Sequence, residues 1–304
     1  MAISVRGCDN AQSLHACHSI RRMPSMHFAK IATTISTQLA KTVQFLPSSC
    51  ALCGLHLSNK SARKSELICT DCYEDFFTAS VSRCSQCALP LLTSLLTPLP
   101  TSSDQIEQST QTAAIEKTPS GAVRCGECIA NPPSFDHTVV ACNYVAPVDQ
   151  LALALKFAHQ LMLAPLLSDL LRDAIVQDAK GDLPDLLAAV PLGQQRLIER
   201  GFNQAVEIGK PLSRQLGIPF LPDLLERTRN TAQQSSLHPD ERQKNVRNAF
   251  IPNELLIEQI YGKHIGIVDD VMTTGTTLHE IATVLKRFGV RRISNYVFAR
   301  TLPH

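Results

Sequence analysis

The segment Ile265-Gly-Ile-Val-Asp-Asp-Val-Met-Thr-Thr-Gly-Thr-Thr-Leu278 joins an apolar run, two carboxylates and a Thr/Gly loop. The run Ile265–Val268 is typical of a strand buried on both faces. The stretch Thr277–Phe288 has the apolar spacing of an amphipathic helix. The loop between them would therefore lie at the carboxyl end of a parallel strand, where open α/β sheets bind ligands.

The loop of this segment offers backbone N–H groups and hydroxyls to an anion. Its residues are Thr273, Thr274, Gly275, Thr276 and Thr277. At a helix N-terminus these donors and the helix dipole favour a phosphate dianion. An ordinary helix cap would explain one Thr, but not two acids followed by five loop residues of this kind. The GK[ST] ending of a Walker A loop is absent, which excludes that type of phosphate site.

The paired acids Asp269 and Asp270 would repel a phosphate, so they need other partners. Sugar hydroxyls are one partner, and a Mg²⁺ ion that offsets pyrophosphate charge is another. Donors for phosphate on one side and acceptors on the other together predict a site for a phosphorylated ribose. The two acids are also the candidate catalytic residues.

Outward from this segment the chain alternates strands and helices from about residue 135 to the end. The expected strands are His137–Val145, Leu186–Pro191, Ile265–Val268 and Arg292–Ala299. The expected helices are Asp149–His159, Leu161–Ala179, Gly201–Leu216 and Thr277–Phe288. This alternation predicts an α/β fold with a parallel sheet and helices on both faces.

Two further loops carry Arg residues suited to phosphate. Arg196 and Arg200 follow the strand Leu186–Pro191, and their guanidinium groups could hold pyrophosphate or simply solvate a helix start. A long polar loop spans Glu226–Phe250. It is a mobile lid, a path for a nucleic-acid backbone or a solvated surface loop. Its nucleic-acid candidates are Arg242, Lys244 and Arg247.

Several motifs together resemble a known family. The string Val268-Asp-Asp-Val-Met-Thr-Thr-Gly275 is similar to the motif for 5-phosphoribosyl 1-diphosphate (PRPP) in type I phosphoribosyltransferases. With Val190-Pro-Leu192, Arg200-Gly-Phe-Asn-Gln-Ala205 and Thr231-Ala-Gln-Gln234, it resembles the ComF family, which includes ComFC and GntX-type proteins. The resemblance covers about residue 45 to the end, apart from an insertion after Pro90.

The resemblance implies a zinc module followed by a phosphoribosyltransferase-like domain. It implies that Asp269 and Asp270 bind the ribose hydroxyls, that the loop 273–277 wraps the 5-phosphate and that Mg²⁺ accompanies PRPP. It also implies a role in natural transformation, with single-stranded DNA as a partner and helicase or DNA-translocation proteins as further partners. The alternative is an active phosphoribosyltransferase of unknown acceptor, in nucleotide metabolism or salvage.

The chain has eleven Cys, and eight of them form CxxC pairs. The pairs are Cys50/Cys53, Cys69/Cys72, Cys84/Cys87 and Cys125/Cys128. A CxxC turn presents two thiolates to one ion, and two turns complete a Cys₄ zinc site. Pairing consecutive turns gives two structural zinc sites, while a cross-braced pairing of first with third and second with fourth stays open. Redox motifs and buried thiols are the rival interpretations.

Three regions follow from these patterns. We expect an N-terminal extension over residues 1–45, a Cys-rich zinc module over 46–134 with a disordered insertion near 92–121, and a phosphoribosyltransferase-like domain over 135–304. One hypothesis is that translation starts at Met26, which an intact-mass measurement tests. Paired thiols without a signal peptide or membrane span favour the cytoplasm. The formal net charge of +2 neither requires nor excludes nucleic acid.

Overall fold

The computed structural model describes residues 49–57, 67–78, 81–91, 116–117, 123–178, 182–228 and 249–303. The extension expected over residues 1–45 and most of the insertion expected near 92–121 lie outside these ranges. The described part of that insertion is the strand β1 (Glu116–Lys117), which pairs antiparallel with β2 (Val123–Arg124). The boundaries proposed between the three regions stay predictions.

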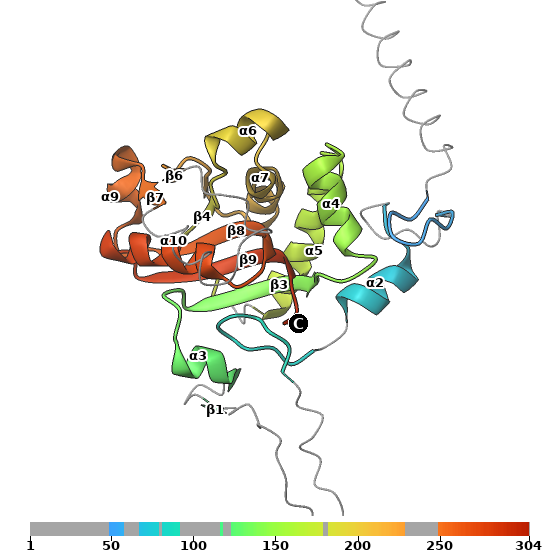
Figure 1. Ribbon diagram of the computed structural model, residues 1–304, viewed down its shortest axis with the longest axis horizontal. Coiled ribbons are helices and arrows are strands. Elements are labelled where there is room, and N and C mark those ends of the chain that lie inside the picture. The colour runs from blue at the N-terminus through green and yellow to red at the C-terminus, as the bar shows by residue number, and fades with distance from the viewer. Residues whose placement is uncertain are drawn as a thin grey trace, which may run out of the picture. The chain divides into compact units, whose positions relative to one another are not determined.

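A five-stranded sheet with the order β3-β9-β8-β4-β5 forms the centre of the fold (Figure 1). Its strands are β3 (His137–Asn143), β9 (Arg292–Arg300), β8 (His264–Met272), β4 (Leu186–Ala189) and β5 (Phe220–Leu221). All four neighbouring pairs are parallel. The register sets Ala189 opposite Val268, so β4 and β8 end side by side. The predicted parallel α/β sheet is confirmed.

Helices cover both faces of this sheet, because alternate residues of each strand point to opposite sides. On one face Val268 of β8 packs in a core cluster with residues of α4 (Asp149–Phe157), α5 (Leu163–Asp178) and α7 (Gln204–Leu216). On the other face Ile267 packs with residues of α10. The bounds of α10 are Thr276–Arg287.

Short elements complete the described structure. They are α2 (Thr70–Phe77), α3 (Gly126–Ala130), α6 (Gln194–Arg200), β6 (Leu225–Arg227), β7 (Phe250–Pro252), a 3₁₀ turn (Glu254–Leu256) and α9 (Ile257–Ile260). The strands β6 and β7 pair antiparallel at the two ends of the expected long polar loop, so those ends are ordered strands. In the described part of the chain, no helix combines the length and hydropathy that a membrane span needs.

The expected helix Gly201–Leu216 starts later than predicted. Gly201 has a φ of 74° and ends α6, while the Asn203 side chain caps α7 by accepting a hydrogen bond from the Ala205 N–H at 3.0 Å. The Asn203 amide also donates to the Val190 carbonyl at 3.0 Å. The helix α6 therefore lies in the stretch expected as a loop before this helix, and Asn203 ties the junction of α6 and α7 to the end of the β4 strand.

Candidate ligand-binding and metal sites

One cavity lies at the carboxyl ends of β4 and β8 and brings together segments that are far apart in the chain. Its volume is about 200 Å³. Most of the predicted ligand residues line it, namely Arg196, Arg200, Asp269, Asp270, Thr273, Gly275, Thr276 and Thr277. Lys156, Asn203, Gln204 and Arg227 also line it. The predicted Thr274 does not line this cavity and faces a neighbouring one.

The acidic pair is held by backbone hydrogen bonds. The Asp269 Oδ1 accepts a hydrogen bond from the Asp270 N–H at 2.9 Å, and the Asp270 Oδ1 accepts one from the Val271 N–H at 2.9 Å. The Lys156 Nζ of α4 forms an ion pair with the Asp270 Oδ2 at 2.7 Å. Asp270 is buried, so the ion pair compensates a charge that water reaches poorly.

The two acids differ in their electrostatic setting. Burial raises the pKa of Asp269 to about 8, with the adjacent Asp270 acting in the same direction and Lys156 opposing both. The Asp269 carboxyl therefore takes up a proton at a higher pH than an ordinary Asp does. A protonated carboxyl donates one hydrogen bond and accepts others, which suits a sugar hydroxyl.

The Thr/Gly loop turns through Gly275, which has a φ of 83° and stands at the N-cap of α10. A left-handed backbone of this kind favours glycine. The Thr274 and Thr276 hydroxyls are hydrogen-bonded to each other at 2.8 Å. The Thr276 N–H also donates to the Thr274 hydroxyl oxygen at 3.4 Å. Gly275, Thr276 and Thr277 line the cavity, so the N-terminus of α10 borders it, as an anion site of this kind requires.

Three Arg residues supply positive charge to the same cavity. Arg196 and Arg200 come from α6, and Arg227 comes from β6. The Arg200 guanidinium lies over the Phe157 ring at 5.1 Å from its centroid, and burial lowers the pKa of Arg200. Four cationic side chains against two carboxylates leave the lining with a net positive charge. An anionic ligand complements this charge.

Two cationic residues of the cavity, Lys156 and Arg227, were not predicted from the sequence. Lys156 lies in the last turn of α4, which is far from the acidic pair in the chain. Nothing in the sequence around Lys156 distinguishes it from a solvent-exposed helix residue. Arg227 falls in the loop that was expected to be polar and irregular. Asn203 belongs to the Arg200-Gly-Phe-Asn-Gln-Ala205 motif, and that motif is the signal that could have identified it.

The eight paired Cys form two separate groups. The first centre is Cys50, Cys53, Cys69 and Cys72, and the second centre is Cys84, Cys87, Cys125 and Cys128. In each group the sulfur atoms all lie within 4.8 Å of one another. This is the sequential pairing, and the cross-braced alternative is not the arrangement found.

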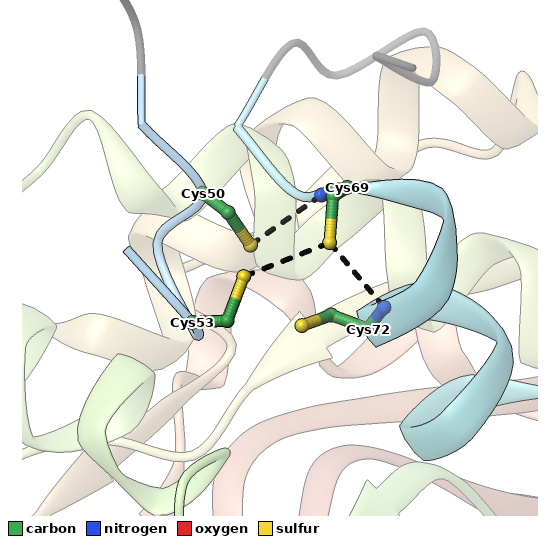
Figure 2. Close-up of side chains that lie close together, drawn as sticks. All are labelled: Cys50, Cys53, Cys69 and Cys72. Carbon is green, nitrogen blue, oxygen red and sulfur yellow. Dashed lines mark hydrogen bonds between the residues drawn. The ribbon is translucent and has the colours of Figure 1, made fainter. Parts of the chain in front are cut away.

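The distances suit a tetrahedral ion. Figure 2 shows the four side chains of the first centre turned toward one another, with the Cys53 and Cys69 sulfurs 3.8 Å apart. In the second centre the Cys87 and Cys125 sulfurs are 3.6 Å apart. Thiolates at about 2.3 Å from one zinc ion would be separated by about 3.8 Å. Both groups could therefore hold zinc.

Backbone N–H groups point at the sulfurs of both centres. The Cys69 N–H donates to the Cys50 sulfur at 3.4 Å, and the Cys125 N–H donates to the Cys84 sulfur at 3.3 Å. Such hydrogen bonds stabilise thiolates and fix the ligand orientation. Apart from the exposed Cys53, these Cys side chains also belong to the core clusters on the two faces of the sheet, the first centre on the α5 face and the second on the α10 face.

The nucleic-acid candidates Arg242, Lys244 and Arg247 lie outside the described residues. The described ends of their segment are β6 and β7, and Arg227 of β6 lines the cavity. That segment therefore starts and ends close to the ligand site, and its own contribution stays a prediction.

Comparison with known proteins adds the following likenesses. The family described as phosphoribosyl transferase domain matches residues 203–302. The DNA utilization protein YhgH of Escherichia coli K12 is 38% identical over 181 residues, which are 59% of this chain and 78% of that protein. Competence protein F of Haemophilus influenzae is 37% identical over 183 residues, covering 59% and 79% of the two chains. Competence protein ComFC of Streptococcus pneumoniae is 31% identical over 111 residues, covering 36% and 46%.

Proposed function

Because this chain belongs to the ComF family of competence and DNA utilization proteins, we propose that its cavity binds a phosphorylated ribose and that the protein acts in DNA uptake. In this proposal the loop 273–277 binds the 5-phosphate, and Asp269 and Asp270 bind the ribose hydroxyls. The eight paired Cys hold structural zinc.

The observation that supports this proposal is that a single cavity brings together the paired acids, the start of α10 and the Arg side chains. The acids Asp269 and Asp270 follow β8, and the loop donors start α10 directly after them. Arg196 and Arg200 face them from α6. A phosphorylated ribose in this cavity would meet acceptors for its hydroxyls and donors for its phosphate. PRPP would also bring its pyrophosphate toward the Arg residues, which bind phosphate oxygens bidentately.

Isothermal titration calorimetry with ribose 5-phosphate and with PRPP tests the ligand. We expect binding that weakens at least about tenfold in Asp269→Asn/Asp270→Asn, because the loss of even one charge-assisted hydrogen bond costs about 1.5 kcal/mol or more. Titrations of PRPP with and without Mg²⁺ test the ion that the resemblance implies. Asp223→Asn, an exposed carboxylate outside the cavity, is the matched control and should bind as the wild type does. Wild-type protein that binds neither compound contradicts the proposal.

We further propose that the protein binds single-stranded DNA in the cytoplasm, where a reducing environment keeps the metal-binding thiols reduced. Arg242, Lys244 and Arg247 are the expected phosphate contacts. Replacing all three by Ala should weaken binding at low salt and reduce the salt dependence, because each lost phosphate contact lowers the slope of log K against log salt by about 0.7.

A matched control removes three cations at the opposite end of the sheet. Lys263, Arg287 and Arg291 are exposed and lie near the amino-terminal ends of β8 and β9. Gel-shift assays with both triple variants separate a local DNA path from general charge. An equal loss of DNA affinity in the two variants, or no DNA binding by the wild type at low salt, would contradict the DNA proposal.

A second candidate function is transfer of ribose 5-phosphate from PRPP to an acceptor. Arg227 and the two Arg of α6 line the same cavity as the acids, so departing pyrophosphate would meet positive charge. Asp269 and Asp270 would hold the ribose while its C1 bond breaks. Release of pyrophosphate from PRPP in the presence of nucleobases would establish this activity, and its absence alongside tight ligand binding would favour a sensing role.

A further inference from the structure

Arg300 joins the second Cys centre to the start of the Thr/Gly loop. It is the last residue of β9 and is 5% exposed. Its Nε donates to the Cys87 carbonyl at 3.1 Å. Its Nη1 donates to the Met272 carbonyl at 3.2 Å and also to the Thr273 carbonyl. One guanidinium therefore spans from a CxxC turn to the first residues of the loop.

The second Cys centre supplies the counter-charge for the buried Arg300 guanidinium. Within the described ranges no Asp or Glu forms an ion pair with it, and its hydrogen-bond partners are backbone carbonyls and Thr301. The second centre is its neighbour, since Cys87 and Cys128 line the same cavity as Arg300. A zinc ion with four thiolates carries a net charge of about −2. The second centre thus compensates a buried cation that would otherwise be costly.

A second contact connects the same CxxC turn to the loop. Gln86, between Cys84 and Cys87, donates to the Phe135 carbonyl at 3.0 Å. The Phe135 ring lies beside Gly275, since a Cβ added there would stand 3.7 Å from the ring. One cavity of about 470 Å³ is lined by residues of both the second centre and the loop, namely Cys87, Cys128, Arg300, Thr274 and Gly275. The second centre and the loop are direct neighbours.

We propose that Arg300 is a positioning residue through which the second Cys centre holds the phosphate loop in its binding geometry. Loss of that centre would leave the guanidinium buried without its counter-charge and would free the Met272 and Thr273 carbonyls. The first centre packs on the other face of the sheet, so its loss should not act on the loop in this way. The identity of the ligand rests on the proposed function, but the order of the unliganded loop does not.

Hydrogen exchange of the full-length, zinc-loaded protein tests this coupling without any ligand. Peptides covering residues 272–277 would be followed in Cys84→Ser/Cys128→Ser and in Cys50→Ser/Cys72→Ser. Each double variant should lose one zinc per chain. We expect loop exchange to rise about tenfold or more in the first variant, because charge-assisted hydrogen bonds are the stronger class. We expect little change in the second. A rise of equal size in both, or none in the first, would overturn the proposal.

The same measurement on Arg300 variants applies if the Cys variants fail to fold. Arg300→Gln should retain both zinc ions and still raise loop exchange, while Arg300→Lys should restore part of the protection. Arg292→Gln is the matched control, since Arg292 lies at the other end of β9 and pairs with Asp182. Unchanged exchange in Arg300→Gln at full zinc content rejects the positioning role. Titration of ribose 5-phosphate into the same wild-type protein reports separately on the proposed ligand.

Discussion

Asp269 is a carboxyl whose burial opposes its charge, while its neighbour Asp270 has a cation of its own in Lys156. The asymmetry follows from position. Asp270 points to α4 and pairs with Lys156 at 2.7 Å, whereas Asp269 is oriented by the Asp270 N–H. The raised pKa of Asp269 suits hydrogen bonds with a neutral hydroxyl, while Asp270 is held by its ion pair with Lys156.

This difference predicts how stability depends on pH. The pKa of Asp269 is raised from 3.8 to about 8, so between these values the folded state binds a proton that the unfolded chain has released. The free energy of unfolding should fall as pH rises through this window, by up to about 1.4 kcal/mol per pH unit. Asp269→Asn removes this contribution, and its melting temperature should exceed that of the wild type increasingly toward about pH 8. Asp223→Asn is the control. A difference in melting temperature between Asp269→Asn and the wild type that stays constant across pH would contradict the raised pKa.

At the residue scale, the sequence identified the groups that meet the ligand locally but not those that arrive from elsewhere. The acids and the loop donors are contiguous, so their chemistry is legible in one segment. Lys156 approaches Asp270 only because α4 packs against the sheet, and no local pattern encodes that approach. Membership of the contiguous motif is also not sufficient. Thr274 belongs to the motif, but it lines the neighbouring cavity and not the ligand cavity.

The turn into α10 is the element on which the anion site depends, and Gly275 is its weak point. A Cβ at Gly275 would meet the Met272 Cε at 2.5 Å, and the φ of 83° is unfavourable for any L side chain. Gly275→Ala should therefore cost about 1 kcal/mol or more of stability and should weaken ribose 5-phosphate binding at least about tenfold.

Gly217→Ala is the matched control for this prediction. Gly217 ends α7 with a φ of 69°, has no atom within 4 Å of an added Cβ and lies outside the cavity. Its substitution should lower the melting temperature to a similar extent and leave the affinity unchanged. Comparable loss of affinity in both variants would mean that general destabilisation, not the loop geometry, controls binding.

At the element scale, the long buried strands and the amphipathic helices could be predicted because their periodicity is strong. Arg292–Ala299 and Thr277–Phe288 differ from β9 and α10 by one residue at their ends. The helix α6 was missed because none of its residues is buried, so it has no apolar period to recognise. The strands β6 and β7 were missed because each has three residues and their pairing joins distant segments.

At the scale of the whole molecule, the two Cys centres join the hydrophobic core on both faces of the sheet. The first centre clusters with residues such as Leu167 and Phe298, and the second with Phe135 and Leu278. These segments have few apolar residues of their own, so metal binding should supply the free energy that orders them. The Cys-rich segments and the α/β domain should therefore unfold together rather than as independent units.

Removal of metal tests this cooperativity. We expect two zinc ions per chain, one for each Cys centre, measured by elemental analysis of the purified protein. Stripping both with a chelator should lower the melting temperature by about 10 °C or more, since structural zinc sites contribute several kcal/mol to folding. When the zinc-loaded protein is heated, the loss of helix and the release of zinc should occur in a single transition. Far-UV circular dichroism reports the helices of the α/β domain. A chelator that strips both ions without shifting the helical transition would show that the α/β domain folds independently of the Cys centres.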